Sequence, residues 1–373
     1  MTIIRKGVTD LPLHGGKAPW WLLKRMKGLA GSIVDLVIDE HGQGELIKRL
    51  SDPYWFQALS CILAYDWHSS GTTTVLCGVL KSVIDPAKHG MGVAGGKGKH
   101  SRKAPDDLCH LSEVLALSGK STDEVLRASK MAAKVDNCAV QDGYNIYHHS
   151  VFVDEKGDWS VIQQGLNEEK RYARRYQWHN DIESYVLEPH TGISGKREID
   201  VLDMTSKHSM GAQKTITDIV NEGPTKVRRL VESLRKDGQC GLEKWIPGLN
   251  ECTQSVLRLP ESVNWTAIKA AYEWKPENFE GVLEVRGMGP KTIRGLAMVS
   301  QLVYGDEPSW EDPVRYSFAY GGKDGVPFPV ERNAMDESVG FLREIVDGSN
   351  AEKKDKIDAF KRLERYARNI RKI

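Results

Sequence analysis

The residues best suited to chemistry lie in a glycine turn in the last third of the chain. Residues 279–304 read FEGVLEVRGMGPKTIRGLAMVSQLVY, which predicts an apolar helix, a turn over Gly287 to Lys291, and a second apolar helix. The glycines at 287 and 289 permit a tight bend with N–H groups facing outward, and Pro290 suits the first position of a helix. Because such amides form an anion site at a helix amino terminus, we expect the turn to bind phosphate.

This segment resembles the helix-hairpin-helix DNA-binding motif, whose glycine turn holds a backbone phosphate without reading the base sequence. The resemblance implies DNA contacts at Gly287, Met288, Gly289 and Thr292, and a monovalent cation that bridges the hairpin to the phosphate. Ligases, polymerases, nucleases and recombination proteins also use the motif as a clamp. The motif alone therefore does not define an activity.

An aspartate downstream extends the resemblance to a class of enzymes. Asp312 stands 21 residues beyond Lys291, after the expected end of the second hairpin helix near Gly305. This layout is similar to that of the helix-hairpin-helix base-excision DNA glycosylases, over about residues 209–346. It implies that Asp312 opens the next helix and that Lys291 matches the lysine of the bifunctional members. The sequence Glu311-Asp312-Pro313 departs from the family's Val-Asp-Thr-like start, and the spacing is slightly long.

The resemblance implies a DNA glycosylase with AP-lyase activity. A damaged base would be flipped out of the duplex at a cost of roughly a few kcal/mol. Lys291 would attack the sugar C1′ and form a Schiff base, while Asp312 would stabilise positive charge on the sugar or accept a proton. No diffusible cofactor is required. In the structural alternative, Lys291 is a common lysine of noncatalytic hairpins, and Asp312 caps a helix that begins at Pro313.

Two basic segments predict further contacts with nucleic acid. Residues 88–103 read KHGMGVAGGKGKHSRK, with five glycines, five Lys or Arg and no acid, so the backbone could approach a phosphate and the side chains neutralise it. In RYARRYQWHN the arginines recur at helical spacing between aromatic residues, which predicts a helix face that grips phosphates. In both segments the alternative is a solvated surface. The expected contacts are Lys97, Lys99, Arg102, Lys103, Arg171, Arg174 and Arg175.

A β-hairpin is expected between these helical parts, and it raises the possibility of a metal site. YHHSVFVD and WSVIQQG are strand-like runs joined by a turn at Gly157. Successive strand side chains point to opposite faces, so His148 and His149 cannot enter the same site. His149 with Asp136 and Asp142 could form a nuclease-type centre for a divalent metal, or it could be a strand histidine satisfied by a hydrogen bond.

Three functions therefore stay open. They are the glycosylase, a metal-dependent DNA or RNA nuclease with the hairpin as a clamp, and a noncatalytic DNA-binding protein. DNA is the expected partner in each, with RNA as an alternative. A chelator would abolish the nuclease and leave the glycosylase active.

The elements that must position these residues predict an α+β protein that is mainly α. Apolar spacing predicts helices over 19–40, 53–67 and 71–84, and two more that begin at Pro105 and Ser121. We expect a helical domain with a β-hairpin or small antiparallel sheet over 1–205, and an all-α helix-hairpin-helix domain over 206–373. Residues 189–206 would connect them. The tail 352–373 predicts an amphipathic helix packed on the second domain, with its basic face outward.

Composition narrows these classes. The chain has 52 Lys or Arg against 51 Asp or Glu, so nucleic-acid binding must come from local patches. The six cysteines are scattered without a CxxC pair, which argues against a zinc ribbon and favours reduced thiols. No apolar run approaches the ~18 residues of a membrane span, and the start lacks the apolar core of a signal peptide. We expect a cytoplasmic protein without a membrane partner.

The whole chain also resembles a prokaryotic, largely archaeal family known as domain of unknown function 763. The segments LPLHGGKAP, DWHSSGTTT, VAGGKGKHSRK, QDGYNIYHH, VIQQG and YSFAYGGKDG carry this likeness. It implies no mechanism for the amino-terminal half.

Overall fold

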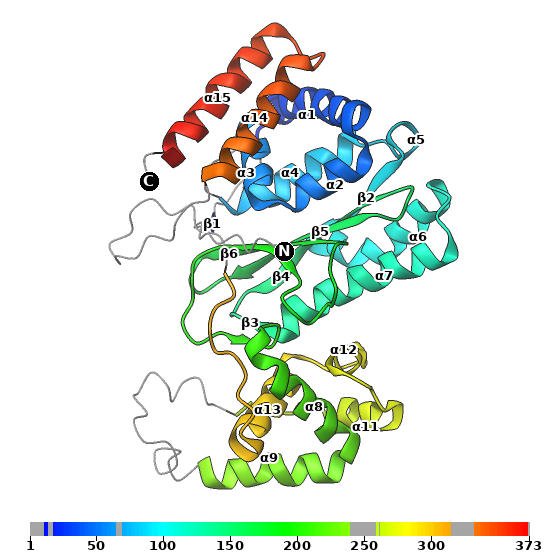
Figure 1. Cartoon of the computed structure of the whole chain (residues 1–373), viewed down its shortest axis with the longest axis vertical. Helices are drawn as coiled ribbons and strands as arrows, with labels where there is room; N and C mark the ends of the chain where they lie inside the picture. Colours follow the sequence, from blue (N-terminus) through cyan, green and yellow to red (C-terminus); the bar gives the residue numbers. More distant parts are fainter. Residues whose placement is uncertain are drawn as a thin grey trace.

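The computed structural model describes residues 11–13, 18–64, 69–238, 259–260, 262–314 and 332–371. An antiparallel sheet lies between two groups of helices, and a smaller helical unit continues from one of them (Figure 1). The predicted α+β class with mainly helical content is confirmed. Within the described ranges, no helix has the length and apolar character needed to cross a membrane.

The main sheet has six strands, ordered β1-β6-β5-β4-β2, with β7 also paired to β6. Its strands are β1 (Leu11–Pro12), β2 (Met91–Lys97), β4 (Asn145–Asp154), β5 (Trp159–Asn167), β6 (Tyr172–His179) and β7 (His190–Ser194). β4 and β5 form the predicted β-hairpin, and Gly157 in its turn has a φ of +88°. Glycine suits this left-handed position because it has no Cβ.

One face of the sheet packs against helices from both ends of the chain (Figure 1). These helices are α1 (Trp20–His41), α2 (Gln43–Ser51), α3 (Pro53–Ile62), α4 (Ser70–Val83), α5 (Pro86–His89), α14 (Arg332–Gly348) and α15 (Lys353–Arg371). α3 begins where predicted because the Asp52 carboxylate accepts hydrogen bonds from two backbone N–H groups and Pro53 takes the first helical position. Phe152 and Ile162 of the sheet share this core.

The tail helices belong to this amino-terminal core. α15 contacts α3 and α14, and its residues Ala359 and Leu363 are buried with side chains of α1 to α4. Arg362 Nε also donates to the Ile62 carbonyl at 2.8 Å. The tail is helical as predicted, but the expectation that it packs on the carboxy-terminal domain is wrong, because its apolar side is buried against α3. The expected domain over 206–373 therefore loses these two helices to the other side of the molecule.

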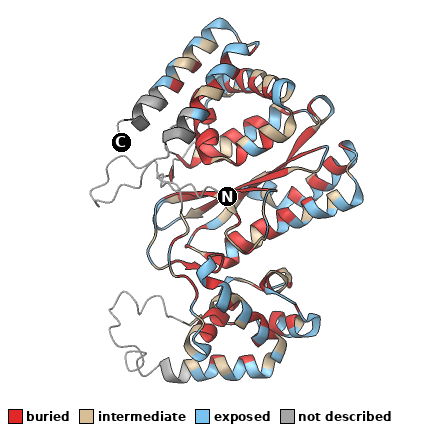
Figure 2. Ribbon diagram, in the orientation of Figure 1, coloured by how far each residue is buried: buried red, intermediate tan, exposed pale blue. Residues whose placement is uncertain are grey.

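The opposite face of the sheet packs against α6 (Ala104–Val114) and α7 (Gly119–Lys134), which follow the 3-10 turn η1 (Gly98–Lys103). The helical unit consists of α8 (Met210–Glu222), α9 (Pro224–Gly238), α11 (Trp265–Trp274), α12 (Phe279–Glu284) and α13 (Pro290–Val299). α7 contacts both the sheet and α12, so buried side chains continue from the sheet into this unit (Figure 2).

The segments by which the chain enters and leaves the helical unit lie side by side. β8 (Leu202–Asp203) pairs with β3 (Val140–Gln141), and Asp203 also pairs with Ser309, where the chain returns. The segment expected as a plain connection, 189–206, therefore contains the strands β7 and β8. Residues 204 to 308 form an insertion with adjacent ends.

Two basic segments differ from their predicted structure. RYARRYQWHN forms strand β6 rather than a helix, since a strand covered on both faces lacks the alternation that reveals a strand in sequence. Much of the glycine-rich segment forms strand β2. A Cβ at Gly92 would lie 2.4 Å from Leu111, and one at Gly95 would lie 2.2 Å from the His149 carbonyl oxygen. These glycines let α6 and β4 approach β2 closely, so they do not cradle a phosphate.

Candidate nucleic-acid interface

The glycine turn joins α12 to α13 as predicted. Gly287 has a φ of +86°, and a Cβ there would lie 2.9 Å from Nδ2 of Asn264. Asn264 donates through Nδ2 to the Gly287 carbonyl and through its backbone N–H to the Thr292 hydroxyl, each at 3.1 Å. Thr292 is buried, so its hydroxyl fixes the turn from inside. The prediction that Thr292 contacts DNA is therefore wrong.

The outer side of the turn carries backbone amides and a lysine. Gly289 has a φ of −109°, which any residue can adopt, and a Cβ there would meet nothing closer than 3.9 Å. Neither backbone conformation nor packing requires glycine at this position. Within the described part of the chain, the N–H groups of Gly289 and Lys291 have no hydrogen-bond partner, and the exposed Lys291 side chain has no ion pair. These groups lie at the positive end of α13.

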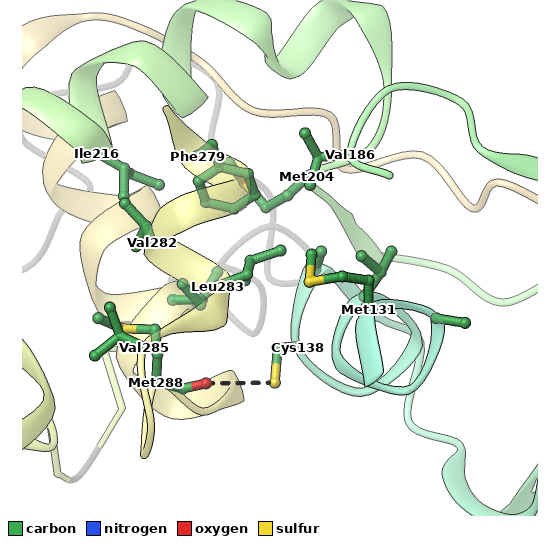
Figure 3. Close-up of a cluster of buried hydrophobic side chains, with 14 of the residues drawn as sticks. Met131, Cys138, Val186, Met204, Ile216, Phe279, Val282, Leu283, Val285 and Met288 are labelled. Carbon is green, nitrogen blue, oxygen red and sulfur yellow. Dashed lines mark hydrogen bonds between the residues drawn. The ribbon is translucent and has the colours of Figure 1, made fainter. Parts of the chain in front are cut away.

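The inner side of the turn packs against α7 and the π-helical turn η2 (Val135–Ala139). Met288 is fully buried in the cluster that contains Met131 and Cys138 (Figure 3), so the prediction that Met288 contacts DNA is also wrong. Lys134 Nζ donates to the Met288 carbonyl at 2.9 Å. The Cys138 thiol donates to the same oxygen at 3.7 Å (Figure 3). Gln141 Nε2 donates to the Pro290 carbonyl at 2.9 Å.

Lys134 thus places a positive charge on a carbonyl of the hairpin. The resemblance predicted a monovalent cation at the hairpin, and the structure shows an ammonium group on the Met288 oxygen. Burial lowers the pKa of Lys134, and the nearby Lys130 acts in the same direction. Lys134, Cys138 and Gln141 also belong to this site, and no pattern in the sequence predicted their contacts with the turn.

Asp312 binds Arg174 of β6. Its carboxylate accepts from Arg174 Nη2 and from the Glu198 N–H at 2.6 Å each, from Arg174 Nη1 at 3.0 Å and from the Val314 N–H at 2.9 Å. Both side chains of the ion pair are fully buried. Residues 309–314 are not helical, so the prediction that Asp312 opens a helix at Pro313 is wrong. The carboxylate serves instead to neutralise a buried guanidinium.

Lys291 and Asp312 therefore do not form a pair. No hydrogen bond or ion pair links them, because the Asp312 carboxylate is occupied by Arg174 and backbone amides. Arg174 also donates to Asp142 at 2.8 Å, and the Tyr176 hydroxyl donates to the same Asp142 oxygen at 2.6 Å. The two carboxylates enclose one guanidinium inside the protein.

Arg174 and Arg175 are both fully buried, so neither can contact nucleic acid. As successive strand residues they point to opposite faces of the sheet. Arg175 lies over the Phe56 ring, 4.6 Å from its centroid, and donates to Gln177 at 3.1 Å. The prediction of an exposed guanidinium face is wrong for these two residues. Arg171 precedes the strand and is exposed.

Asp136 lies in a buried network of its own. Its carboxylate accepts from the Gln163 side-chain amide and from Trp178 Nε1 at 3.0 Å. The other oxygen lies 2.5 Å from Nε2 of His190. Both carboxylate oxygens of Asp136 are therefore hydrogen-bonded to neighbouring side chains.

His149 joins the same network as a strand residue satisfied by hydrogen bonds. Its ring lies 2.8 Å from the Ser129 hydroxyl and 2.9 Å from Oε1 of Gln163. Burial lowers its pKa. Among the described residues, no three His, Cys, Asp or Glu are placed to hold one metal ion. The predicted centre of Asp136, Asp142 and His149 is therefore not assembled.

A row of polar side chains crosses the other face of the sheet. The register aligns one residue from each of β2, β4, β5, β6 and β7, namely Lys97, His148, Gln164, Arg175 and Ser194. Nδ1 of His148, Oε1 of Gln164 and Oγ of Ser194 are buried without a hydrogen-bond partner among the described residues. Burial lowers the pKa of His148 to about 3, so the ring is neutral at pH 7. As predicted, His148 and His149 occupy opposite faces.

The basic segment around η1 keeps its positive charge at the surface. Lys97, Lys99, Arg102 and Lys103 are all exposed. None of the four forms an ion pair with a residue that the structure describes. Although Gly92 and Gly95 serve packing, this segment can supply cations to a polyanion.

The fold and the turn define a protein in which a helix-covered antiparallel sheet supports a glycine-turn helical unit. The chain belongs to the family described as "Protein of unknown function (DUF763)", whose model matches residues 7–330. No curated protein and no solved structure matches the chain significantly. The tail helices α14 and α15 lie beyond the matched residues.

Proposed function

We propose that the protein binds DNA through the sugar–phosphate backbone at the hairpin turn, with little dependence on base sequence. The observation that carries this proposal is the open surface at Gly289, where the N–H groups of Gly289 and Lys291 have no hydrogen-bond partner among the described residues and the Lys291 side chain is exposed at the start of α13. A phosphate oxygen accepts such hydrogen bonds and is favoured by the helix dipole. The exposed cations near η1 and Arg171 would add backbone contacts. RNA is the alternative partner.

A DNA glycosylase with AP-lyase activity is the second candidate. The exposed Lys291 amine beside the turn favours it, because a Schiff base with a sugar C1′ needs an accessible amine. Asp312 takes no part in this candidate mechanism, since its carboxylate binds Arg174. No diffusible cofactor is needed. The metal-dependent nuclease has less support, because Asp136 and Asp142 lie in separate networks.

The DNA-binding proposal is tested by placing an anion on the turn. Gly289→Asp should weaken binding to a short duplex at least about tenfold, because its carboxylate would occupy the amides that a phosphate needs. Gly289→Ala adds a methyl group in open space and serves as the matched control. Wild-type affinity should fall steeply between about 50 and 200 mM salt. Salt-insensitive binding, or equal affinity of the two variants, would overturn the proposal.

The lyase candidate is tested separately by borohydride trapping on a panel of damaged duplexes. Wild-type protein should give a covalent adduct, and Lys291→Gln should give none at a protein concentration at which it still binds the duplex. If no duplex is trapped and no base is released, the lyase candidate fails and the binding proposal stands on its own test.

A further inference from the structure

The carbonyl groups on the inner side of the hairpin turn are held by residues 134–141, which run from the end of α7 through η2 into β3. Lys134 and Cys138 bind the Met288 oxygen, and Gln141 binds the Pro290 oxygen. These contacts span 149 to 154 residues of sequence, so they join the segment from α7 to β3 with the helical unit. The turn is therefore fixed from a different part of the fold.

The geometry of the peptide bond transmits this contact to the outer side. A peptide unit is planar and trans, so its C=O and its N–H point in opposite directions. The unit that contains the Met288 carbonyl also contains the N–H of Gly289, and the unit with the Pro290 carbonyl contains the N–H of Lys291. The Gly289 and Lys291 amides, which have no hydrogen-bond partner within the described ranges, thus each lie opposite a carbonyl that a residue of the 134–141 segment binds.

The Met288–Gly289 and Pro290–Lys291 peptide units are held in different ways. The Lys291 N–H belongs to the first turn of α13, whose helical geometry already directs it. The Gly289 N–H precedes the helix, and Gly287 beside it is exposed. The direction of the Gly289 N–H therefore depends on what binds the Met288 oxygen. A cation on that oxygen also polarises the peptide unit, which makes the N–H a stronger donor.

Resting on the proposed DNA-binding function, we infer that Lys134 is a positioning residue: it binds the Met288 carbonyl and thereby holds the Gly289 N–H toward the phosphate. Lys134 itself points to the inner side of the turn and does not contact DNA. Its effect is on the strength of one hydrogen bond, and the number of phosphates that the protein neutralises stays the same.

The chain offers a matched control for this inference. Lys130 lies one helical turn before Lys134, is exposed and makes no hydrogen bond to the turn. Lys130→Gln and Lys134→Gln remove the same charge from nearly the same place. We expect Lys134→Gln to weaken duplex binding about tenfold, the scale of one charge-assisted hydrogen bond, and Lys130→Gln to weaken it less than about twofold. Lys134→Arg should restore most of the affinity.

Salt dependence separates positioning from direct contact. Removing a lysine that contacts phosphate lowers the slope of log affinity against log salt by about 1. Lys134→Gln should leave this slope unchanged, whereas Lys291→Gln should lower it. A reduced slope for Lys134→Gln would overturn the inference, because it would make Lys134 a phosphate contact. Equal affinities of Lys134→Gln and Lys130→Gln would also overturn it.

A spectroscopic readout covers the case in which Lys134→Gln does not fold. In ¹⁵N-glycine-labelled full-length protein, inorganic phosphate should shift the Gly289 amide resonance. Gln141→Leu, which leaves Lys134 in place, should keep that shift, and Lys134→Arg should keep most of it. Loss of the shift in Gln141→Leu alone would refute the role of Lys134. If wild-type protein shows no shift and binds no DNA, the proposed function itself fails.

Discussion

Asp312→Asn should destabilise the fold rather than disable a reaction. The carboxylate accepts four hydrogen bonds, two of them from the buried guanidinium of Arg174. An asparagine keeps one oxygen but turns an NH₂ group toward groups that are themselves donors. Removing one member of a buried ion pair costs about 3–5 kcal/mol. Because Arg174 keeps its bonds to Asp142 and the Lys196 carbonyl, we expect the lower end, about 3 kcal/mol.

Urea unfolding followed by tryptophan fluorescence measures this loss. The matched control is Glu311→Gln, which neutralises the exposed neighbouring carboxylate and should change the free energy of unfolding by less than about 0.5 kcal/mol. In a double-mutant cycle, Arg174→Met and Asp312→Asn should be strongly non-additive. If Asp312→Asn were as stable as wild type yet removed a measurable base-excision activity, our structural account of Asp312 would be refuted.

Three further predictions concern the sheet and the tail. The unfolded chain takes up a proton at His148 below about pH 6.5, and the folded chain does so only near pH 3. The free energy of unfolding should therefore fall as pH falls between these values, by up to about 1.4 kcal/mol per pH unit. His148→Gln should flatten this pH dependence in urea titrations, and an unchanged slope would disprove that His148 is buried in its neutral form. Gly95→Ala should lower the stability measured by thermal unfolding by more than about 2 kcal/mol, because the added methyl group would overlap a carbonyl oxygen. Gly98→Ala places its methyl group in open space and should cost about 1 kcal/mol, for the positive φ alone. Similar losses for the two variants would contradict the packing argument. Truncation after Asn350 should lower the melting temperature by exposing the core beneath α15, and a fully stable truncated protein would refute that packing.

Local patterns predicted the helices and the hairpin well. α1, α3, α4 and α6 begin within one residue of the predicted starts and α7 begins two residues early, because capping residues and 3.6-residue periodicity are local signals. The β4–β5 hairpin followed from its turn, and the glycine turn at Gly287 followed from the residue that a positive φ requires.

Partners that are distant in sequence explain the errors. Arg174 and Arg175 match helical spacing as well as strand spacing, and the carboxylates that enclose Arg174 lie 32 and 138 residues away. Nothing near residue 174 indicates a buried guanidinium. Lys134 was not predicted as part of the site for the same reason, since the Met288 oxygen that it binds is 154 residues away. A lysine near the end of an amphipathic helix is ordinarily a solvated residue.

The contact between Arg362 and Ile62 has a consequence for the order of events during synthesis. These residues are 300 positions apart, and the core between them is completed only by α14 and α15. At roughly 5–20 residues per second, a ribosome needs roughly 15–60 s to make the intervening chain. Throughout that interval the apolar surface of α3 has no covering helix from the tail, although α8 to α13 of the helical unit have already been synthesised. The nascent amino-terminal helices are therefore a natural client for a chaperone that shields apolar surface until the tail is released.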